Sequence, residues 1–136
     1  IGASLARWVT RKAQVIGVEL GGEAVECARS NAPQVEILRG KCADRIPQLR
    51  EWAKISGVRL LYVNPPRTGL EPEILTWATD ECRPERLAYL SCSAGTLSRD
   101  LRALTVAGYK VEALVPYDFF PQTHHVETLA LLRQMF

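Results

Sequence analysis

The sequence lacks an apolar run that approaches the roughly 18 residues of a membrane span. Its beginning also lacks the plan of a secretory signal. Charges nearly balance: 17 basic residues stand against 15 acidic ones, and the net charge of +2 is too small to argue nucleic-acid binding by itself. These absences lead us to expect a cytoplasmic protein with no membrane partner.

Closely spaced cysteines are also missing. The four cysteines are Cys27, Cys42, Cys82 and Cys92, and no two have the spacing of a zinc knuckle or a redox motif. Without a secretory signal we expect free thiols in a reducing compartment, and we expect no metal site. An ordinary cysteine of this kind is a small buried hydrophobe. Only Cys92 departs from that expectation, because of where it lies in the chain.

What the sequence does contain is a regular alternation of helical and strand-like segments over 136 residues, a length that suits one domain, 1–136. The expected helices are 3–12, 23–32, 46–56, 73–82 and 96–107, and the expected strands are 13–19, 34–39, 58–63, 87–91, 109–115 and 126–132. This alternation predicts an α/β fold with a doubly wound, mostly parallel sheet. The last two strands follow one another across a short connection, so we expect a C-terminal antiparallel pair.

Three short segments in the second half of the chain carry groups suited to chemistry. They are Asn64-Pro65-Pro66-Arg67, Ser91-Cys92-Ser93, and the segment 120–127, which ends on Glu127. The first two follow apolar runs typical of buried parallel strands, and in open α/β sheets ligands bind beyond the carboxyl ends of strands. Cys92 is therefore a candidate nucleophile and Glu127 a candidate base. A carboxylate in an otherwise apolar strand is costly to bury without a partner or a purpose.

The beginning of the chain has a weaker pattern. The chain opens on a helix just after Gly2, and the strand that follows ends on Glu19. This resembles the second half of a nucleotide-binding βαβ unit, in which a glycine-rich turn approaches the ligand and an acid binds ribose hydroxyls. A glutamate that closes a strand is more often a solvated end residue, so this pattern alone decides nothing.

Four motifs together resemble the RNA uracil-5-methyltransferase family, in its order and spacing over almost the whole chain. The segment 15–32 looks like the family's second strand and helix, and 64–70 is similar to its Asp-Pro-Pro-Arg-x-Gly-Leu loop. The segment 90–101 is similar to its Ser-Cys-Asn nucleophile motif with the helix behind it, and 118–127 to its terminal signature. No single motif would be specific, but the four in order are.

The resemblance implies a Rossmann-like class I methyltransferase domain with S-adenosylmethionine as cofactor and RNA, either tRNA or ribosomal RNA, as partner. It implies that Gly2 belongs to a glycine-rich first motif whose preceding strand is missing from this chain. We therefore expect a carboxyl-terminal fragment of a longer, monomeric enzyme. Loss of that central strand should impair both stability and cofactor binding.

The resemblance also assigns the chemistry. The Cys92 thiolate would add to carbon 6 of uracil and so activate carbon 5 for methylation, after which Glu127 would remove the proton from carbon 5. Enzymes of this kind reach their base by taking it out of its stack. The implied cofactor-binding residues are Gly2, Glu19, Asp44 and Asn64, with Glu19 on the ribose and Asp44 near the adenine. The implied substrate-binding residues are Pro65, Pro66 and Arg67, with Arg67 pairing with phosphate or helping to hold the site.

Two departures from the family pattern leave alternatives open. Asn64 stands where the family has aspartate, which replaces a charge by an amide that both donates and accepts hydrogen bonds. Ser93-Ala94 stands where the family has Asn-Pro. The alternatives are a non-catalytic relative that binds RNA or a partner protein, and a related methyltransferase that acts on another base or on protein. Retention of both Cys92 and Glu127 favours the enzyme.

Some of these residues also have purely structural interpretations. Asn-Pro-Pro is a common loop opener, because proline sets the backbone in advance. Phe119 and Phe120 are expected in the core more often than as base-stacking platforms. His124 and His125 suit solvated positions in a turn.

Overall fold

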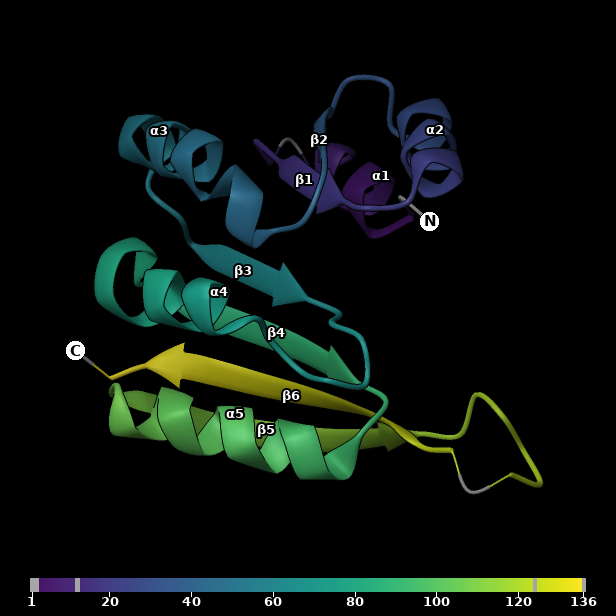
Figure 1. The fold of residues 1–136 in the computed structure, drawn as a ribbon, viewed down its shortest axis with the longest axis vertical. Coiled ribbons are helices and arrows are strands. Elements are labelled where there is room, and N and C mark those ends of the chain that lie inside the picture. The colour runs from purple at the N-terminus through teal and green to yellow at the C-terminus, as the bar shows by residue number, and fades with distance from the viewer. Residues whose placement is uncertain (1–2, 12, 124, 136) are drawn as a thin grey trace. The chain divides into compact units, whose positions relative to one another are not determined.

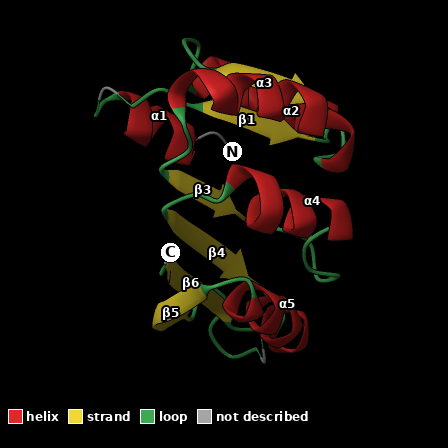
Figure 2. Cartoon of the chain, turned by 90° about the vertical axis from the view of Figure 1, so that its left-hand side faces the viewer, coloured by secondary structure: helices red, strands yellow, loops and turns green. Residues whose placement is uncertain are grey.

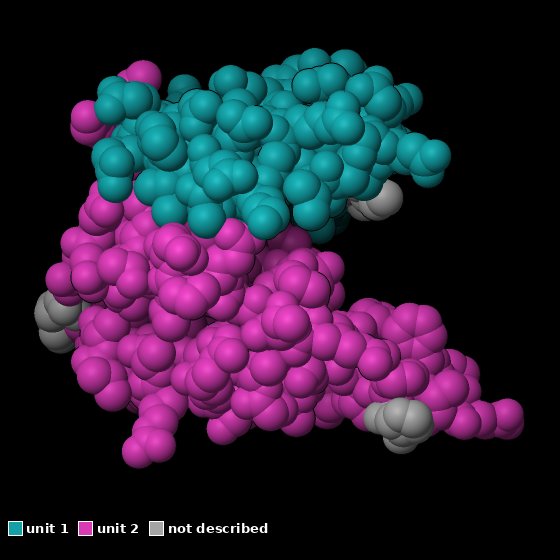
Figure 3. All heavy atoms as spheres, in the orientation of Figure 1, with its two compact units in different colours: residues 1–52 teal, residues 53–136 magenta. Residues whose placement is uncertain are grey.

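The structure is a computed structural model that describes residues 3–11, 13–123 and 125–135. The chain divides into two compact units, residues 1–52 and residues 53–136, which Figure 3 draws in different colours. The division falls within one helix, and each unit has a sheet of its own. In the ranges described, no helix has the length and apolar character that a membrane span requires.

The first unit is a parallel βαβ arrangement preceded by a helix. Its elements are α1 (Ala3–Val9), β1 (Ile16–Glu19), α2 (Gly22–Asn31), β2 (Glu36–Arg39), the 3-10 helix η1 (Ala43–Arg45) and the start of α3 (Ile46–Ser56). Strands β1 and β2 pair in parallel, from Ile16 with Glu36 to Glu19 with Arg39. This confirms the parallel pairing predicted for the first two strands. Figure 1 shows the crossover through α2.

A small apolar core holds the first unit together. Helix α2 presents Val25, Ala28 and the following Ala32 at the spacing of one helical face, and these pack with Val35 and Ile37. Helix α1 packs against the same cluster. A methyl group on Gly17 would lie 3.1 Å from the Leu5 side chain, so the glycine in β1 lets α1 approach the strand closely.

The second unit contains a four-stranded mixed sheet and the helices of one layer. Its elements are β3 (Leu60–Val63), α4 (Pro72–Thr76), the π-helix η2 (Trp77–Cys82), β4 (Arg86–Ser91), α5 (Ala94–Val106), β5 (Tyr109–Tyr117) and β6 (Glu127–Gln134). The strand order is β3-β4-β6-β5. Strands β3 and β4 are parallel, whereas β6 runs antiparallel to both of its neighbours. The predicted C-terminal antiparallel pair is therefore confirmed.

The two faces of this sheet differ in burial. On β4, Leu87, Tyr89 and Ser91 are buried, and their face is the one that α4 and α5 cover (Figure 2). Alternate residues of a strand point to opposite faces. The other face, which we call the second face, therefore carries residues such as Leu90 and Leu131, and these are half-buried and exposed, respectively.

Most differences from the predicted elements lie at their ends. Strands β1, β2 and β3 begin two or three residues later than predicted, because the ladders begin at Ile16 with Glu36 and at Leu60 with Arg86. Helix α5 begins earlier, at Ala94. The predicted helix 3–12 ends at Val9, and position 12 is outside the described residues.

One predicted helix changes type within its length. The segment predicted as a helix over 73–82 is α-helical for about one turn and then becomes the π-helix η2. The wider turn closes with a hydrogen bond of 3.0 Å from the Arg83 backbone N–H to the carbonyl of Ala78. Arg83 adopts a left-handed conformation with φ of 44°, which ends the helix before the buried Pro84.

Candidate active site

Three polar positions meet at one edge of the sheet in the second unit. Asn64 follows β3, Cys92 follows β4, and Glu127 is the first residue of β6. Because β3 and β4 are parallel and β6 runs against β4, the ends of the first two strands and the start of the third lie at the same edge. The topology thus brings together the segments that the sequence singled out for chemistry in this unit.

Cys92 and Glu127 each lie one residue beyond the last ladder pair of β4 and β6. The last ladder pair of these strands is Ser91 with Thr128, and one further step along the same antiparallel register would pair Cys92 with Glu127. Residues opposite one another in antiparallel strands have Cα atoms about 4.5–5.5 Å apart and side chains on the same face. Both residues are half-buried, so their side chains remain accessible to a ligand.

Tyr62 supports this placement independently. Its ladder partner is Ala88, which lies on the second face of the sheet. Burial first, and then the negative charge of Glu127, raise the pKa of the Tyr62 hydroxyl. Such a charge effect requires proximity. This charge effect agrees with a position of Glu127 on the second face of the sheet, on which Tyr62 lies.

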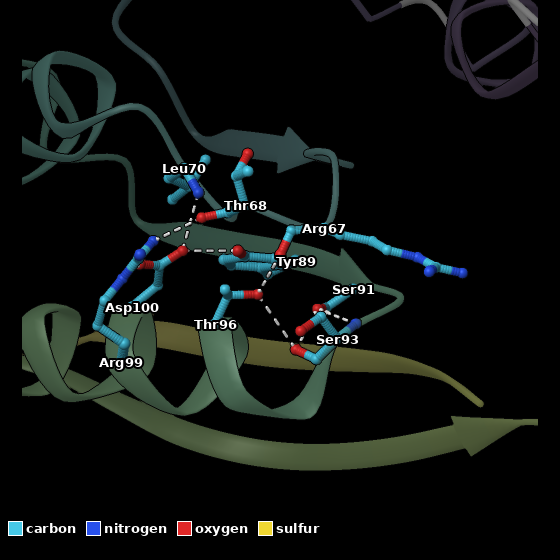
Figure 4. Close-up of polar contacts among 9 residues, drawn as sticks. All are labelled: Arg67, Thr68, Leu70, Tyr89, Ser91, Ser93, Thr96, Arg99 and Asp100. Atoms are coloured by element: carbon cyan, nitrogen blue, oxygen red, sulfur yellow. Dashed lines mark hydrogen bonds and ion pairs between the residues drawn. The ribbon is translucent and has the colours of Figure 1, made fainter. Parts of the chain in front are cut away.

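A tight serine turn holds Cys92 between β4 and α5. The backbone N–H of Ser93 donates to Ser91 Oγ at 3.1 Å, and that hydroxyl donates in turn to the Ser93 carbonyl at 3.0 Å (Figure 4). Ser93 is the N-cap of α5, with an extended backbone. Cys92 thus lies just before the first turn of a 13-residue helix.

Helix α5 also fastens the loop that follows β3. The carbonyl of Arg67 accepts a hydrogen bond of 3.1 Å from Thr96 Oγ1, and the carbonyl of Thr68 accepts one of 3.0 Å from Arg99 Nη2. The backbone N–H of Leu70 donates to Asp100 Oδ2 at 2.9 Å. Figure 4 shows these contacts along one side of the loop. They fix the backbone that carries Pro65, Pro66 and Arg67.

Asp100 is the centre of this attachment, and the sequence reasoning did not identify it. The side chain is 1% exposed; its Oδ2 also accepts from the Tyr89 hydroxyl at 2.7 Å, and its Oδ1 pairs with Arg99 Nη2 at 2.7 Å. Burial and the hydrogen bond to Asp100 raise the pKa of Tyr89. A signal was present in the sequence, because Asp100 shares a helix face with the apolar Leu97 and Leu104.

The loop itself faces solvent. Asn64, Pro66 and Arg67 are exposed, and Pro65 is half-buried. Arg67 Nη2 lies 3.4 Å from Nδ1 of His125, which belongs to the connection between β5 and β6. This contact links the loop after β3 to the segment that leads into Glu127.

The first unit carries two of the predicted cofactor residues. Glu19 ends β1 and is half-buried, and its Oε1 accepts a hydrogen bond of 3.0 Å from the backbone N–H of Gly21. Asp44 is exposed in η1, just after β2. Since β1 and β2 are parallel, both acids lie toward the carboxyl edge of this sheet. Gly2 is outside the described residues.

Two sequence-based expectations about burial are wrong. The four cysteines are free thiols, but Cys27 is exposed and the other three are half-buried, so none of them is a core residue. Phe119 and Phe120 are exposed rather than packed in the core. Both phenylalanines lie in the connection between β5 and β6 and not in a strand or helix.

Other surface features do not coincide with these residues. Two surface hollows of about 440 and 330 Å³ are lined entirely by residues of the first unit and include neither Glu19 nor Asp44. Within the described ranges, no group of three or more His, Cys, Asp or Glu side chains could hold a metal ion. The candidate site therefore consists of the polar residues at the strand ends.

The chain has the Rossmann-like fold of the class I methyltransferases. The structure is similar to DNMT2 of Spodoptera frugiperda, with a TM-score of 0.70 at 13% identity over 98% of this chain and 46% of that one. It is also similar to fibrillarin of Aeropyrum pernix, solved with natively bound S-adenosyl-L-methionine, with a TM-score of 0.59 at 16% identity over 86% and 55% of the two chains. These likenesses establish the fold.

Sequence comparison identifies the family within that class. The model of the tRNA (uracil-5-)-methyltransferase family matches residues 11–135, so the chain belongs to this family. An uncharacterized RNA methyltransferase of Clostridium acetobutylicum is 40% identical over 90% of this chain, and one of Lactobacillus johnsonii is 39% identical over 98% of it. The chain spans 27% and 30% of the lengths of these relatives. The family and fold expected from the motifs are confirmed.

Proposed function

We propose that this chain is the catalytic domain of an enzyme that transfers a methyl group from S-adenosylmethionine to carbon 5 of uridine in tRNA or ribosomal RNA. The reaction passes through a covalent bond between Cys92 and the uracil ring. The observation that carries the proposal is the β4–β6 ladder, whose last pair, Ser91 with Thr128, lies directly beside Cys92 in one strand and Glu127 in the other. Membership of the family supports RNA as the substrate. The proposal places the enzyme in the cytoplasm, where thiols stay reduced.

The cofactor supplies an electrophilic sulfonium methyl group when it is bound. Glu19 suits the ribose hydroxyls, because its half-buried carboxylate ends a parallel strand and is oriented by the N–H of Gly21. Asp44, exposed after β2, suits the edge of the adenine. Asn64, at the carboxyl end of β3, presents an amide to the cofactor or to the imide edge of the target base.

Cys92 provides the nucleophile. Carbon 5 of uracil reacts poorly by itself, so the thiolate adds to carbon 6, and the ring electrons move to form an enolate. Carbon 5 of the enolate would then take the methyl group, and the cofactor's sulfur would keep the electron pair of the broken sulfur–carbon bond and leave as a neutral thioether. The bond between sulfur and carbon 6 is temporary and breaks in the last step.

Glu127 provides the base for that last step. After methylation, carbon 5 still carries its original proton. The Glu127 carboxylate takes this proton, the electron pair restores the carbon 5–carbon 6 double bond, and the sulfur of Cys92 leaves as thiolate. A half-buried carboxylate that begins β6 at the same end of the sheet as Cys92 suits this role, because it is accessible to a base held there.

The loop 64–67 faces the target. Pro65 and Pro66 restrict its backbone, and the hydrogen bonds from Thr96 and Arg99 fasten it to α5. Such rigidity holds a base that has been taken out of its stack in one orientation. The exposed Arg67 guanidinium suits an RNA phosphate, which it can bind with two hydrogen bonds.

A labelled-methyl assay tests the proposal. The full-length protein is incubated with unmodified tRNA and ribosomal RNA transcripts and tritiated S-adenosylmethionine, and the RNA is digested to nucleosides. We expect 5-methyluridine from the wild type, and a loss on the order of 10³-fold or more in Cys92→Ala. Cys27→Ala, which removes an exposed thiol in the first unit, is the matched control and should retain activity. Label in another nucleoside, or full activity in Cys92→Ala, would contradict the proposal.

A further inference from the structure

Two aromatic side chains stack on one another at the surface of the second unit. The ring centroids of Tyr117 and Phe119 are 5.2 Å apart and their planes differ by 11°. Tyr117 is 38% exposed and Phe119 is 57% exposed. Large apolar groups left in contact with water need a reason, and a stacked pair offers flat ring surface to a ligand.

The pair lies beside the proposed reaction site. Tyr117 is the last residue of β5, and its ladder partner is Glu127 on β6. Partners in this register share a face, so Tyr117 lies on the second face of the sheet, as Glu127 does. The aromatic pair is thus one strand away from the proposed base, at the same edge of the sheet.

Hydrogen bonds hold the turn that directly follows Phe119. The carbonyl of Phe120 accepts hydrogen bonds from the backbone N–H of Thr123 at 3.2 Å and from its hydroxyl at 2.7 Å. Pro121 and Gln122 occupy the centre of this turn, and the φ of 67° at Gln122 suits the third position of a type II turn. The aromatic pair therefore lies between the end of β5 and a hydrogen-bonded turn that begins at Phe120, and both limit the movement of its backbone before any ligand binds.

A cation adjoins the same connection. His125 donates its backbone N–H to Thr123 Oγ1 at 3.2 Å, and its ring lies 3.4 Å from Arg67 Nη2. The guanidinium of Arg67 is exposed. Aromatic rings that present their faces beside a cation are the combination that single-stranded nucleic acids use, with bases on the rings and phosphates on the cation.

We propose that Tyr117 and Phe119 form a stacking platform for a base next to the methylated uridine, with Arg67 on a phosphate of the same strand. This inference rests on the proposed function. When a uridine leaves its stack, its neighbours lose a stacking partner, and an aromatic surface beside the reaction site replaces that partner. The platform accepts any base, because every base has a flat face, so it contributes affinity and position rather than sequence preference.

Ultraviolet cross-linking locates the contact without knowledge of the exact substrate. The full-length protein is irradiated with total tRNA and ribosomal RNA of the host cell, and then digested with nuclease and trypsin. Trypsin separates residues 87–99, which contain Cys92, from residues 111–133, which contain Tyr117 and Phe119. We expect a nucleotide attached at Tyr117 or Phe119. Cross-links that map only elsewhere would overturn the platform.

Affinity measurements supply the second test. Changing both Tyr117 and Phe119 to leucine should weaken binding of the same RNA about 5- to 100-fold, as expected for loss of base stacking, whereas Phe119→Trp should retain wild-type affinity. Val106→Ala, at an exposed position of α5, is the control and should change nothing. Unchanged RNA affinity in the double leucine variant would overturn the platform. The aromatic pair would then be a candidate surface for binding a protein partner.

The same variants distinguish a binding role from a structural one. Because both rings are exposed, the double leucine variant should keep the wild-type Tm; a lowered Tm would show that the pair serves the fold and would overturn the platform. Failure of the proposed function would be seen in a different measurement, because the wild-type protein would form no 5-methyluridine. The two inferences therefore fail by different measurements.

Discussion

Asn64 is the position at which the site departs most clearly from the motif it resembles. It directly follows β3 and is exposed, so a ligand meets its amide rather than the carboxylate of the Asp-Pro-Pro-Arg motif. An amide can present a carbonyl oxygen to the same donor that a carboxylate accepts from, but it carries no charge. The exchange therefore alters the strength of an interaction and keeps its geometry.

We predict that Asn64→Asp preserves or raises methyl transfer by the full-length enzyme, because the charged acceptor makes a stronger hydrogen bond to the same donor. The measurement is kcat/KM for 5-methyluridine formation. Gln48→Glu, which makes the same change of charge at an exposed position of α3, is the control. A large loss in Asn64→Asp with folding intact would show that the amide is tuned to this enzyme's own substrate.

Gly69 sits where the loop after β3 meets α5. Its φ is +83°, and a Cβ at this position would lie 2.5 Å from Arg99 Nη2 and 2.6 Å from Asp100 Oδ2. We predict that Gly69→Ala lowers the free energy of unfolding by about 2–4 kcal/mol, because a side chain there strains the backbone and displaces the buried carboxylate. Urea unfolding measures this.

Gly95 provides the matched comparison, because a Cβ there meets nothing within 4 Å. Gly95 lies in the first turn of α5, where alanine is the better helix former. Gly95→Ala should therefore leave stability unchanged or raise it by up to about 1 kcal/mol. If Gly69→Ala and Gly95→Ala lowered the free energy of unfolding equally, the close packing around Gly69 would not be the reason for a glycine there.

The attachment between α5 and the loop after β3 depends on one buried carboxylate. We predict that Asp100→Asn lowers the free energy of unfolding by about 2–4 kcal/mol, because an amide must turn its N–H groups toward either Arg99 or the donors Tyr89 and Leu70. Methyl transfer should fall on the order of tenfold or more, because the loop loses its orientation. Arg102→Ala, exposed on the same helix, is the control. Unfolding and kinetics that match the control would refute the positioning role.

The elements show what the sequence could and could not predict. Helix α3 has its predicted bounds, 46–56, and β4 differs from its prediction by one residue, because apolar periodicity and nearby glycine or proline mark these segments. The π-helix η2 was missed: its 77–82 segment has ordinary helical composition, and the wider turn depends on how the chain reaches Pro84. Tertiary contacts decide such features, and local patterns do not contain them.

Some features of the candidate site could also be predicted from the sequence, and others could not. Cys92 and Glu127 could be proposed from the sequence because they follow or begin strands at positions where chemistry is expected, and their roles stay predictions. The register that relates them could not, since it depends on β6 entering between β4 and β5. Asp100 and the exposed stack of Tyr117 with Phe119 also depend on tertiary contacts, and for the phenylalanine the composition alone favoured the wrong environment.

Two buried tyrosines contribute to the response of the whole molecule to alkali. Burial raises the pKa of Tyr109 to about 12, and it also raises the pKa of Tyr89 with help from Asp100. Both hydroxyls donate hydrogen bonds, Tyr109 to the carbonyl of Pro84 at 3.0 Å and Tyr89 to Asp100. Folding therefore keeps both protons at a pH at which an unfolded tyrosine, with a pKa near 10, loses its own.

We predict that the free energy of unfolding falls as pH rises from about 10 to about 12, because the unfolded chain binds fewer protons than the folded chain in that window. Below about pH 9 these two tyrosines should add no pH dependence. Urea unfolding across the range measures the slope. Tyr109→Phe should be less stable at neutral pH, since it lacks one hydrogen bond, and should show a shallower alkaline slope. An equal slope in this variant would contradict the assignment.

The proposed mechanism depends on Cys92 acting as the nucleophile and Glu127 acting as the base. The most direct test uses the full-length protein, S-adenosylmethionine and target RNA that contains 5-fluorouridine. Fluorine at carbon 5 cannot leave as a proton does, so the RNA should remain bonded to Cys92 after denaturation, on the tryptic peptide 87–99. Glu127→Gln should accumulate the corresponding adduct on ordinary uridine, and Cys92→Ala should form none. Absence of an adduct from the wild type, with RNA and cofactor binding established, would contradict the mechanism.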